Sequence, residues 1–434
     1  MPKVTETPTP PAVALPAPAT VPADVPNRPL TADEAARIAL CHQPSVKVAQ
    51  AGVNAASGRR VQATSGLLPS VSTTSTYTNV FLAPVGAVPT AGATSGFQLT
   101  ASIRQLVFDF NHTRDLVRQA TALQRSATAN FTRVQSDTVL QVKQAFYLYA
   151  QAQRLVTVNE ANVTNTQSQL DLAQARLKAS LGLPADVVRA QAAVASAIFN
   201  LNLARNAASV ASVSLAELMG IDPRTPICLA EANEPEIAAA DPCALTDMAL
   251  RDRPEIHQAQ STVKAAEFAV SAAKTYNSPE FSANAGLLQR GTDFPPGNNT
   301  LTYGLALTWT PFDSGLTAGK VEEAKANLAA ARAELESTKL AVTSDVSQAY
   351  LNLMTAEQRV TTAEAEVANA QEALRLVEGR YKAGLGTFLD VIDAQTALTT
   401  AQTNKVNAQS AVNQARASLA HAVGVPLQAS AQAK

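Results

Sequence analysis

Alternating apolar and polar residues mark four short stretches of this chain as strands. Every second residue is apolar in residues 97 to 103 and 301 to 309, with mostly Thr, Ser, Gln or Gly between them. That period is typical of a strand with one apolar face. A partner strand follows a proline in each case. The alternation of apolar and polar residues is weak over 71 to 77 and clearer over 281 to 287. Since loops rich in Gly, Pro, Asn and Thr separate the members of each pair, we predict two hairpins, at about 69–110 and 279–312.

A different pattern follows each hairpin. Residues 113 to 181 contain no glycine and no proline, and apolar residues recur there at spacings of three and four. This predicts a helix, which at about 1.5 Å per residue is a rod of roughly 100 Å. Gly182 and Pro184 interrupt it, and a second helix over 185–219 is predicted to run back. The same plan recurs as helices over 317–382 and 387–423, so we predict antiparallel coiled coils.

The chain is an internal duplication. RLKASLGLPADVVRAQ begins at Arg176, and RYKAGLGTFLDVIDAQ begins 204 residues later at Arg380. Phe108-Asp109 and Phe312-Asp313 are separated by the same distance. Repetition at a fixed offset indicates two copies of one structural plan, each opened by a short helix, the first over 32–65. The predicted organisation is a disordered Pro-rich segment over 1–28, a first repeat over 29–222, a linker over 223–244, a second repeat over 245–426 and a tail over 427–434.

Composition excludes several classes of function. Lys and Arg number 34 against 35 Asp and Glu, so there is no overall basic field for nucleic acid. The four histidines and three cysteines form no HExxH, CxxC or zinc spacing, and no Ser/His/Asp order or phosphate loop is present, so we expect no metal, no cofactor and no enzyme. No run approaches 18 apolar residues, so a helical membrane span is not expected. Residues 1 to 28 lack the apolar core of a signal peptide.

Aromatic residues gather around the predicted strands. Of the 20 Phe, Tyr and Trp residues, 11 lie within 76–112 and 276–312. Alternating strands flanked by aromatic residues are typical of a transmembrane barrel, but four strands cannot close one. Because lipid excludes open sheet edges, strands in a bilayer would require other chains to complete the barrel. The alternative is a soluble helical protein with an ordinary small sheet.

Several motifs together resemble the TolC family of outer membrane channel proteins. They are LTADEAARIAL from Leu30, the strand ends VFDF and PFDSG, and RYKAGLGTFLDVIDAQ, and the resemblance extends over about residues 29 to 427. It implies a mixed α+β membrane protein in which a homotrimer forms a 12-stranded transmembrane β-barrel and a long periplasmic coiled-coil tunnel.

The same resemblance implies a function and partners. The chain would be the passive exit duct of a tripartite efflux pump or a type I secretion system, located in outer membrane lipid. It would work with a periplasmic adaptor and an inner-membrane transporter. The alternative from another class of protein is a soluble coiled-coil scaffold without channel activity.

The resemblance also assigns an entrance to the tunnel. Asp390 and Asp393 match paired aspartates that ring the periplasmic opening, and three copies would place up to six carboxylates there. The alternative for Asp390 is a capping box with Thr387. Repeat alignment pairs Asp390 with Asp186 and Asp393 with Arg189, so an Arg189–Asp393 contact is a candidate lock.

Other residues carry over from the same alignment. Tyr381 and Asp186 match positions that hold the entrance shut in the family, although the arginine expected opposite them is Gly386 here. The adaptor is expected at the helix tips, with a tight turn as the alternative role; the tip residues are Leu181, Gly182, Leu183, Leu385 and Gly386. The residues expected at the lipid interface, with core packing as the alternative, are Trp309, Tyr303 and Phe281.

One covalent link is also a candidate. Cys228 and Cys243 bracket a short part of the linker, and an oxidising periplasm would permit a disulfide between them. Cys41 is an alternative partner for either one.

Overall fold

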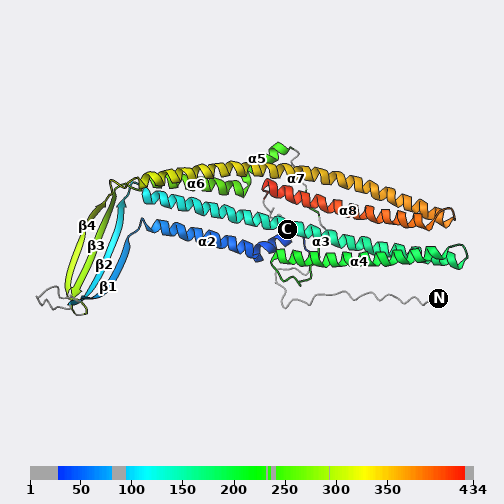
Figure 1. The fold of residues 1–434 in the computed structure, drawn as a ribbon, viewed down its shortest axis with the longest axis horizontal. Coiled ribbons are helices and arrows are strands. Elements are labelled where there is room, and N and C mark those ends of the chain that lie inside the picture. Colours follow the sequence, from blue (N-terminus) through cyan, green and yellow to red (C-terminus); the bar gives the residue numbers. More distant parts are fainter. Residues whose placement is uncertain (1–27, 81–93, 231–232, 236–240, 293, 426–434) are drawn as a thin grey trace, which may run out of the picture. The chain divides into compact units, whose positions relative to one another are not determined.

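The structure is a computed structural model that describes residues 28–80, 94–230, 233–235, 241–292 and 294–425. The first repeat contains α1 (Ala32–His42), α2 (Pro44–Ser65), β1 (Ser70–Val80), β2 (Thr94–Phe108), α3 (His112–Lys178) and α4 (Pro184–Met219). The second contains α5 (Pro242–Asp252), α6 (Pro254–Lys274), β3 (Glu280–Gly291), β4 (Asn298–Thr308), α7 (Leu316–Lys382) and α8 (Phe388–Val423) (Figure 1). The helices α3 and α7 both have 67 residues, and α4 and α8 both have 36, which confirms the tandem repeat.

Each repeat begins with two short helices instead of one. The predicted helix over 32–65 is interrupted at Gln43, and the second repeat has the same interruption at Arg253. Both residues are extended, with ψ of 124° and 132°. The cause is the proline that follows each of them, Pro44 or Pro254, because proline disfavours the helical conformation of the preceding residue and suits the first position of a new helix.

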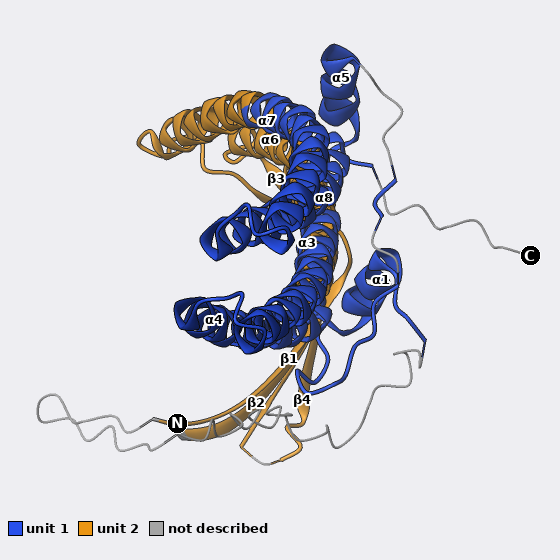
Figure 2. Cartoon of the chain, turned by 90° about the vertical axis from the view of Figure 1, so that its right-hand side faces the viewer, with its two compact units in different colours: residues 1–48, 132–253, 341–434 blue, residues 49–131, 254–340 orange. Residues whose placement is uncertain are grey.

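The chain divides into two compact units (Figure 2). Unit 1 comprises residues 1–48, 132–253 and 341–434, and unit 2 comprises residues 49–131 and 254–340. Unit 1 therefore holds α1, α4, α5, α8 and the C-terminal parts of α3 and α7. Unit 2 holds the sheet, most of α2, α6 and the first turns of α3 and α7.

The sheet of unit 2 is antiparallel in the order β1-β2-β3-β4, so the four predicted strands are confirmed. Its two faces differ in polarity because the register places many apolar residues of β2, β3 and β4 on one face, while β1 adds a mixture of apolar and polar residues. One row, on the apolar face, consists of Val71, Ile103, Ala285 and Tyr303. A neighbouring row, on the polar face, consists of Ser72, Ser102, Gly286 and Thr302. Within the described residues β1 pairs only with β2 and β4 only with β3, so both outer strands keep an open edge.

The largest core of unit 1 lies where α1, α3 and α4 meet. It is formed by Ala35, Ala36, Val142, Phe146, Tyr147, Leu215 and Met219, among others. Alanine is frequent here because small side chains let helices approach closely, while the two aromatic rings fill the remaining space. This core holds α1 and α4 against the middle of α3.

The linker between the repeats is fastened to this core by Glu234, which is only 7% exposed. Its carboxylate accepts hydrogen bonds from the Tyr147 hydroxyl and from Lys143 Nζ, the latter at 2.6 Å. Lys143 also pairs with Asp33 at 2.9 Å. Burial lowers the pKa of Lys143, but hydrogen bonds to these two carboxylates outweigh it and the pKa is raised overall. Burial and then Glu234 raise the pKa of Tyr147.

One helix matches the length and composition of a membrane span. Among the described residues, α4 alone is long and apolar enough to cross a membrane, judged on length and composition. It has no unbroken apolar run, because Ala, Val and Leu are interspersed with polar residues. Part of α4 packs on other helices of unit 1 through Ala190, Leu201 and Leu215.

Candidate functional site at the helix tips

The turns that join α3 to α4 and α7 to α8 have the same backbone design. The Leu181 amide donates to the Arg176 carbonyl at 2.9 Å, and the Leu385 amide donates to the Arg380 carbonyl at 2.8 Å. The preceding residue is left-handed in both, with φ of 61° at Ser180 and 76° at Gly384. This is the arrangement that commonly ends a helix, and it usually requires glycine. The first repeat achieves it with serine.

The two tips of one chain pack against each other within unit 1. The first hairpin contributes Leu170, Ala173 and Ala190, and the second contributes Leu374, Tyr381, Phe388, Val391 and Leu398. Residues about two hundred positions apart therefore share one small core. This core brings the sequence-predicted entrance residues of both repeats into one region.

Asp390 has the capping geometry that the sequence left as one alternative. Its carboxylate accepts from the Thr387 amide at 3.1 Å, and its own amide donates to the Thr387 hydroxyl at 3.2 Å. The hydrogen bond from the Thr387 backbone holds the pKa of Asp390 below its ordinary value. Asp393 lies one turn further along α8 and is exposed. Both carboxylates are thus at the surface beside the tip.

The first repeat lacks this cap. Leu183 precedes α4 without a side-chain hydrogen bond, and Pro184 occupies the first helical position. Asp186 is half-buried and Arg189 is exposed. Arg189 and Asp393 are both exposed, and no ion pair joins them within the described part of one chain, so the candidate lock stays a prediction.

Tyr381 is the most buried of the predicted entrance residues, with 4% exposure. Its ring lies 5.5 Å from that of Phe388, and the Arg176 guanidinium lies 4.6 Å from its centroid. The hydroxyl is buried without a hydrogen-bond partner in the structure. Burial first, and then the charge of Asp186, raise the pKa of Tyr381. Tyr381 and Asp186 are therefore electrostatic neighbours.

The tip leucines are exposed and the tip glycines are confined. Leu181 is 71% exposed and Leu385 74%, and Leu183 is exposed as well. A Cβ on Gly182 would lie 3.1 Å from Cβ of Arg176, and one on Gly386 would lie 3.4 Å from Cβ of Arg380. The glycines serve the turns, while the leucines are available to a partner.

The predicted interface aromatics lie on or beside the sheet. Tyr303 and Phe281 share the apolar face, and Tyr303 is 84% exposed. Trp309 follows the end of β4 and is exposed too. None of the three is packed in a core within one chain, and their place at the lipid interface stays a prediction.

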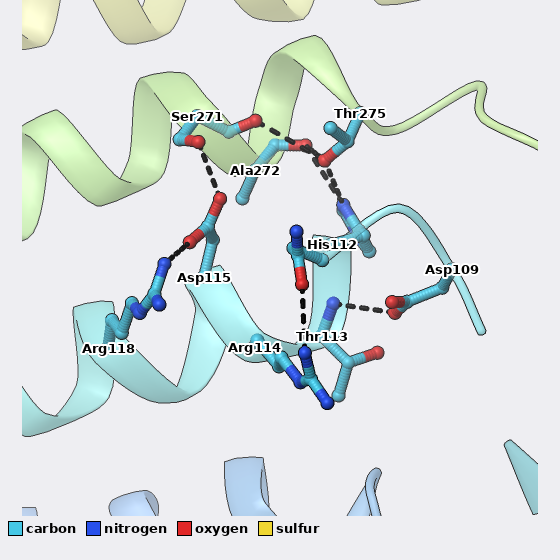
Figure 3. A network of polar contacts seen from close by, with 10 residues as sticks. Asp109, His112, Thr113, Arg114, Asp115, Arg118, Ser271, Ala272 and Thr275 are labelled. Carbon is cyan, nitrogen blue, oxygen red and sulfur yellow. Dashed lines mark hydrogen bonds and ion pairs between the residues drawn. The ribbon is translucent and has the colours of Figure 1, made fainter. Parts of the chain in front are cut away.

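A polar network joins the start of α3 to the end of α6 inside unit 2 (Figure 3). Asp109 accepts from the Thr113 amide at 2.7 Å, capping the start of α3, and Asp313 accepts from the Thr317 amide at 2.8 Å at the start of α7. His112 contacts the Ala272 carbonyl at 2.9 Å. The Phe-Asp pairs of the two repeats therefore mark equivalent strand-to-helix junctions.

The cysteines are not paired. Cys41, Cys228 and Cys243 are free and exposed, so the disulfide considered from the sequence is not formed here. The Cys228 carbonyl accepts from the Leu30 amide at 2.8 Å beside α1, and Cys243 lies in the first turn of α5.

Sequence reasoning missed the role of two arginines. Arg176 and Arg380 each donate from Nη2 to a leucine carbonyl in their own turn, at 3.5 Å to Leu181 and 3.4 Å to Leu385. Each arginine is the first residue of the repeated motif, and this repetition was the sequence feature that could have indicated their role. Among the described residues, no group of three His, Cys, Asp or Glu side chains is placed to hold a metal.

These features define a class of protein. A duplicated chain that combines two long helical hairpins with a four-stranded sheet, apolar on one face and polar on the other, has the fold of outer membrane channel subunits. The sequence model of the outer membrane efflux protein family matches residues 35–221 and 245–425. The chain therefore belongs to this family, as the motifs indicated.

Similar proteins from bacteria agree with this assignment. Over 305 residues the chain is 28% identical to the outer membrane efflux protein BepC of Brucella suis, which covers 69% of this chain and 65% of BepC. Over 371 residues it is 27% identical to the protein CyaE of Bordetella pertussis, covering 83% and 77%. The match thus spans just under two thirds of the length of BepC.

Solved structures show the same fold. The outer membrane protein VceC of Vibrio cholerae superposes with a TM-score of 0.80 at 23% identity, covering 91% of this chain and 96% of that one. The open-state MtrE channel of Neisseria gonorrhoeae superposes with a TM-score of 0.78 at 19% identity, covering 91% and 88%.

Proposed function

We propose that this protein is the outer membrane exit channel of a tripartite efflux pump or type I secretion system, and that it conducts substrates passively out of the periplasm. The sheet carries this proposal. It has one exposed apolar face, one polar face and two open edges, a combination that suits the wall of a water-filled barrel completed by other copies. A soluble coiled-coil scaffold, the alternative, would leave the apolar face exposed to water.

Three copies would supply twelve strands, and their helical hairpins would form the periplasmic tunnel. The tips are the proposed entrance, where Asp390 and Asp393 from each copy would form an acidic ring that favours cations. Asp186, Arg189 and Tyr381 would belong to the contacts that keep this entrance closed.

The remaining surfaces fit the same assignment. The exposed leucines of the tips, Leu181, Leu183 and Leu385, would meet a periplasmic adaptor that links the duct to an inner-membrane transporter. Tyr303, Phe281 and Trp309 would lie against outer membrane lipid, where amphipathic rings are favoured near the headgroups.

Single-channel conductance in a planar lipid bilayer tests the proposal. We expect small cation-selective steps that divalent cations block, and we expect the block to weaken in Asp393→Asn and in the double variant Asp390→Asn, Asp393→Asn. Thr387→Ala is the matched control, because it breaks the capping box while leaving both carboxylates in place.

The outcomes separate the parts of the proposal. If the protein conducts and Asp393→Asn leaves the block by divalent cations unchanged, the channel function would stand and the proposed acidic ring would be refuted. A protein that is folded and yet never inserts into lipid would overturn the channel in favour of the scaffold. Light scattering in detergent checks the assembly, which should have three times the 45.3 kDa mass of the chain.

A further inference from the structure

Arg176, in the last turn of α3, contacts both helical tips of its chain. Its Nη2 donates to the Leu181 carbonyl in its own turn at 3.5 Å. Its Nη1 donates to the Tyr381 carbonyl at 2.6 Å and lies 3.2 Å from the Lys382 carbonyl, both at the end of α7. One side chain therefore bridges two hairpins that belong to different repeats.

The repeat-related arginine does not make this bridge within the chain. Arg380 reaches only the Leu385 carbonyl of its own turn, and its side chain is exposed. Arg176 is half-buried, and its Nε is buried without a hydrogen-bond partner in the structure. The duplicated motif thus explains the turn contact of Arg176, but the contact with α7 is an addition specific to the first repeat.

The chemistry of the bridge favours arginine. The last carbonyls of a helix have no partner inside the helix and carry partial negative charge, so a cation there is favourable. The guanidinium supplies donors in a planar fork and also lies 4.6 Å from the Tyr381 ring centroid. Lysine would retain the charge but would lose both the fork and the planar contact with the ring.

We propose that Arg176 is a latch that fastens the tip of the α7–α8 hairpin to the tip of the α3–α4 hairpin, so that the two tips separate only when its guanidinium leaves the end of α7. The assignment of this motion to channel opening rests on the proposed function. The fastening itself is a property of the chain and has its own measurement.

Three variants isolate the latch. Arg176→Ala removes it, and Arg176→Lys retains the charge without the planar fork. Lys178→Ala is the matched control, because it removes one positive charge from the same last turn of α3, where Lys178 is exposed. Far-UV circular dichroism of the purified full chain verifies that each variant is folded.

Two readouts are applied to each variant. Hydrogen exchange of the amides in residues 379–387 reports the fastening, and single-channel open probability reports the gate. In Arg176→Ala we expect faster exchange in 379–387 and an open probability raised at least about tenfold, the lower end of the ratio that the loss of one charge-assisted hydrogen bond gives. In Arg176→Lys, the exchange rate and the open probability should return only a small part of the way to their wild-type values. Lys178→Ala should match the wild type in both.

Several results would overturn the latch. Exchange in 379–387 that is unchanged in Arg176→Ala would show that the arginine does not fasten α7. Equal effects in Lys178→Ala would assign them to general charge loss, and faster exchange with unchanged open probability would show that the contact does not control opening. A wild-type protein without conductance would overturn the proposed function, and the exchange measurement alone would then decide whether Arg176 fastens the tips.

Discussion

Replacing Gly220 with alanine should destabilise unit 1 by about 3 kcal/mol. Gly220 ends α4 in the left-handed conformation, with φ of 72°. A Cβ at this position would lie 2.8 Å from both the Gln43 nitrogen and the His42 carbonyl carbon. These are backbone atoms at the break between α1 and α2, so they cannot rotate away as a flexible side chain would.

The magnitude is the sum of two effects. A left-handed conformation costs an L-residue about 1–2 kcal/mol, and forcing an extra methyl group into a filled site costs about 1–3 kcal/mol. Gly424, the equivalent residue at the end of α8, separates them. Its φ is 80°, but its Cβ would meet the Arg253 Cγ only at 3.3 Å. Gly424→Ala should therefore incur mainly the conformational cost, about 1–2 kcal/mol.

Denaturant unfolding of the detergent-purified protein, followed by far-UV circular dichroism, measures both variants against the wild type. The midpoint should fall clearly further for Gly220→Ala than for Gly424→Ala, with the slope of the transition unchanged. Equal losses at the two positions would refute the reasoning, because they would mean that the close approach to Gln43 has no energetic consequence.

Three further outcomes follow from the described contacts. Ser180→Gly should stabilise the protein by up to about 1 kcal/mol, since serine is strained at φ of 61°; a lower unfolding midpoint would contradict this. Glu234→Ala should destabilise it by about 3 kcal/mol in the same assay, because it removes the most buried partner of Lys143, and a loss within 0.5 kcal/mol of zero (about the scatter of surface substitutions) would contradict it. The folded-state pKa of Asp390 is lowered, so its capping stabilises α8 fully above the unfolded pKa of about 4 and is lost as pH falls through the folded pKa. The protection of the amides at the start of α8, taken as the intrinsic exchange rate at each pH divided by the observed rate, should fall over that acidic range in the wild type and much less in Asp390→Asn, whereas identical pH profiles of protection would exclude the effect.

Much of the fold follows from local pattern. The absence of glycine and proline over residues 113 to 181 predicted α3 within three residues at its C-terminal end, because helix formation and termination are mostly local. The alternation of apolar residues predicted the four strands for the same reason. Pro44 and Pro254 mark the breaks between the short helices by the same local rule, and the prediction of one helix over 32–65 is wrong at Gln43.

The candidate site was only partly predictable. Asp390 and Thr387 are three residues apart, so their capping box was foreseen as an alternative. Whether Arg189 meets Asp393 depends on the directions of two side chains on different helices, which a repeat alignment does not contain. The same holds for Cys228 and Cys243, whose separation in the chain says little about their separation in space.

By itself, then, the amino-acid sequence determined the duplicated plan, the types of element, the polarity of the two sheet faces and the membership of the family. These depend on the order of residues over a few turns or on repetition at a fixed offset. The tertiary structure alone decided that Arg176 reaches the end of α7, that Glu234 fastens the linker to α3, and that Gly220 lies against the backbone at Gln43. Each of these contacts joins residues 87 or more positions apart in the chain. Packing brings such residues together, and no local pattern in the chain records the distance between them.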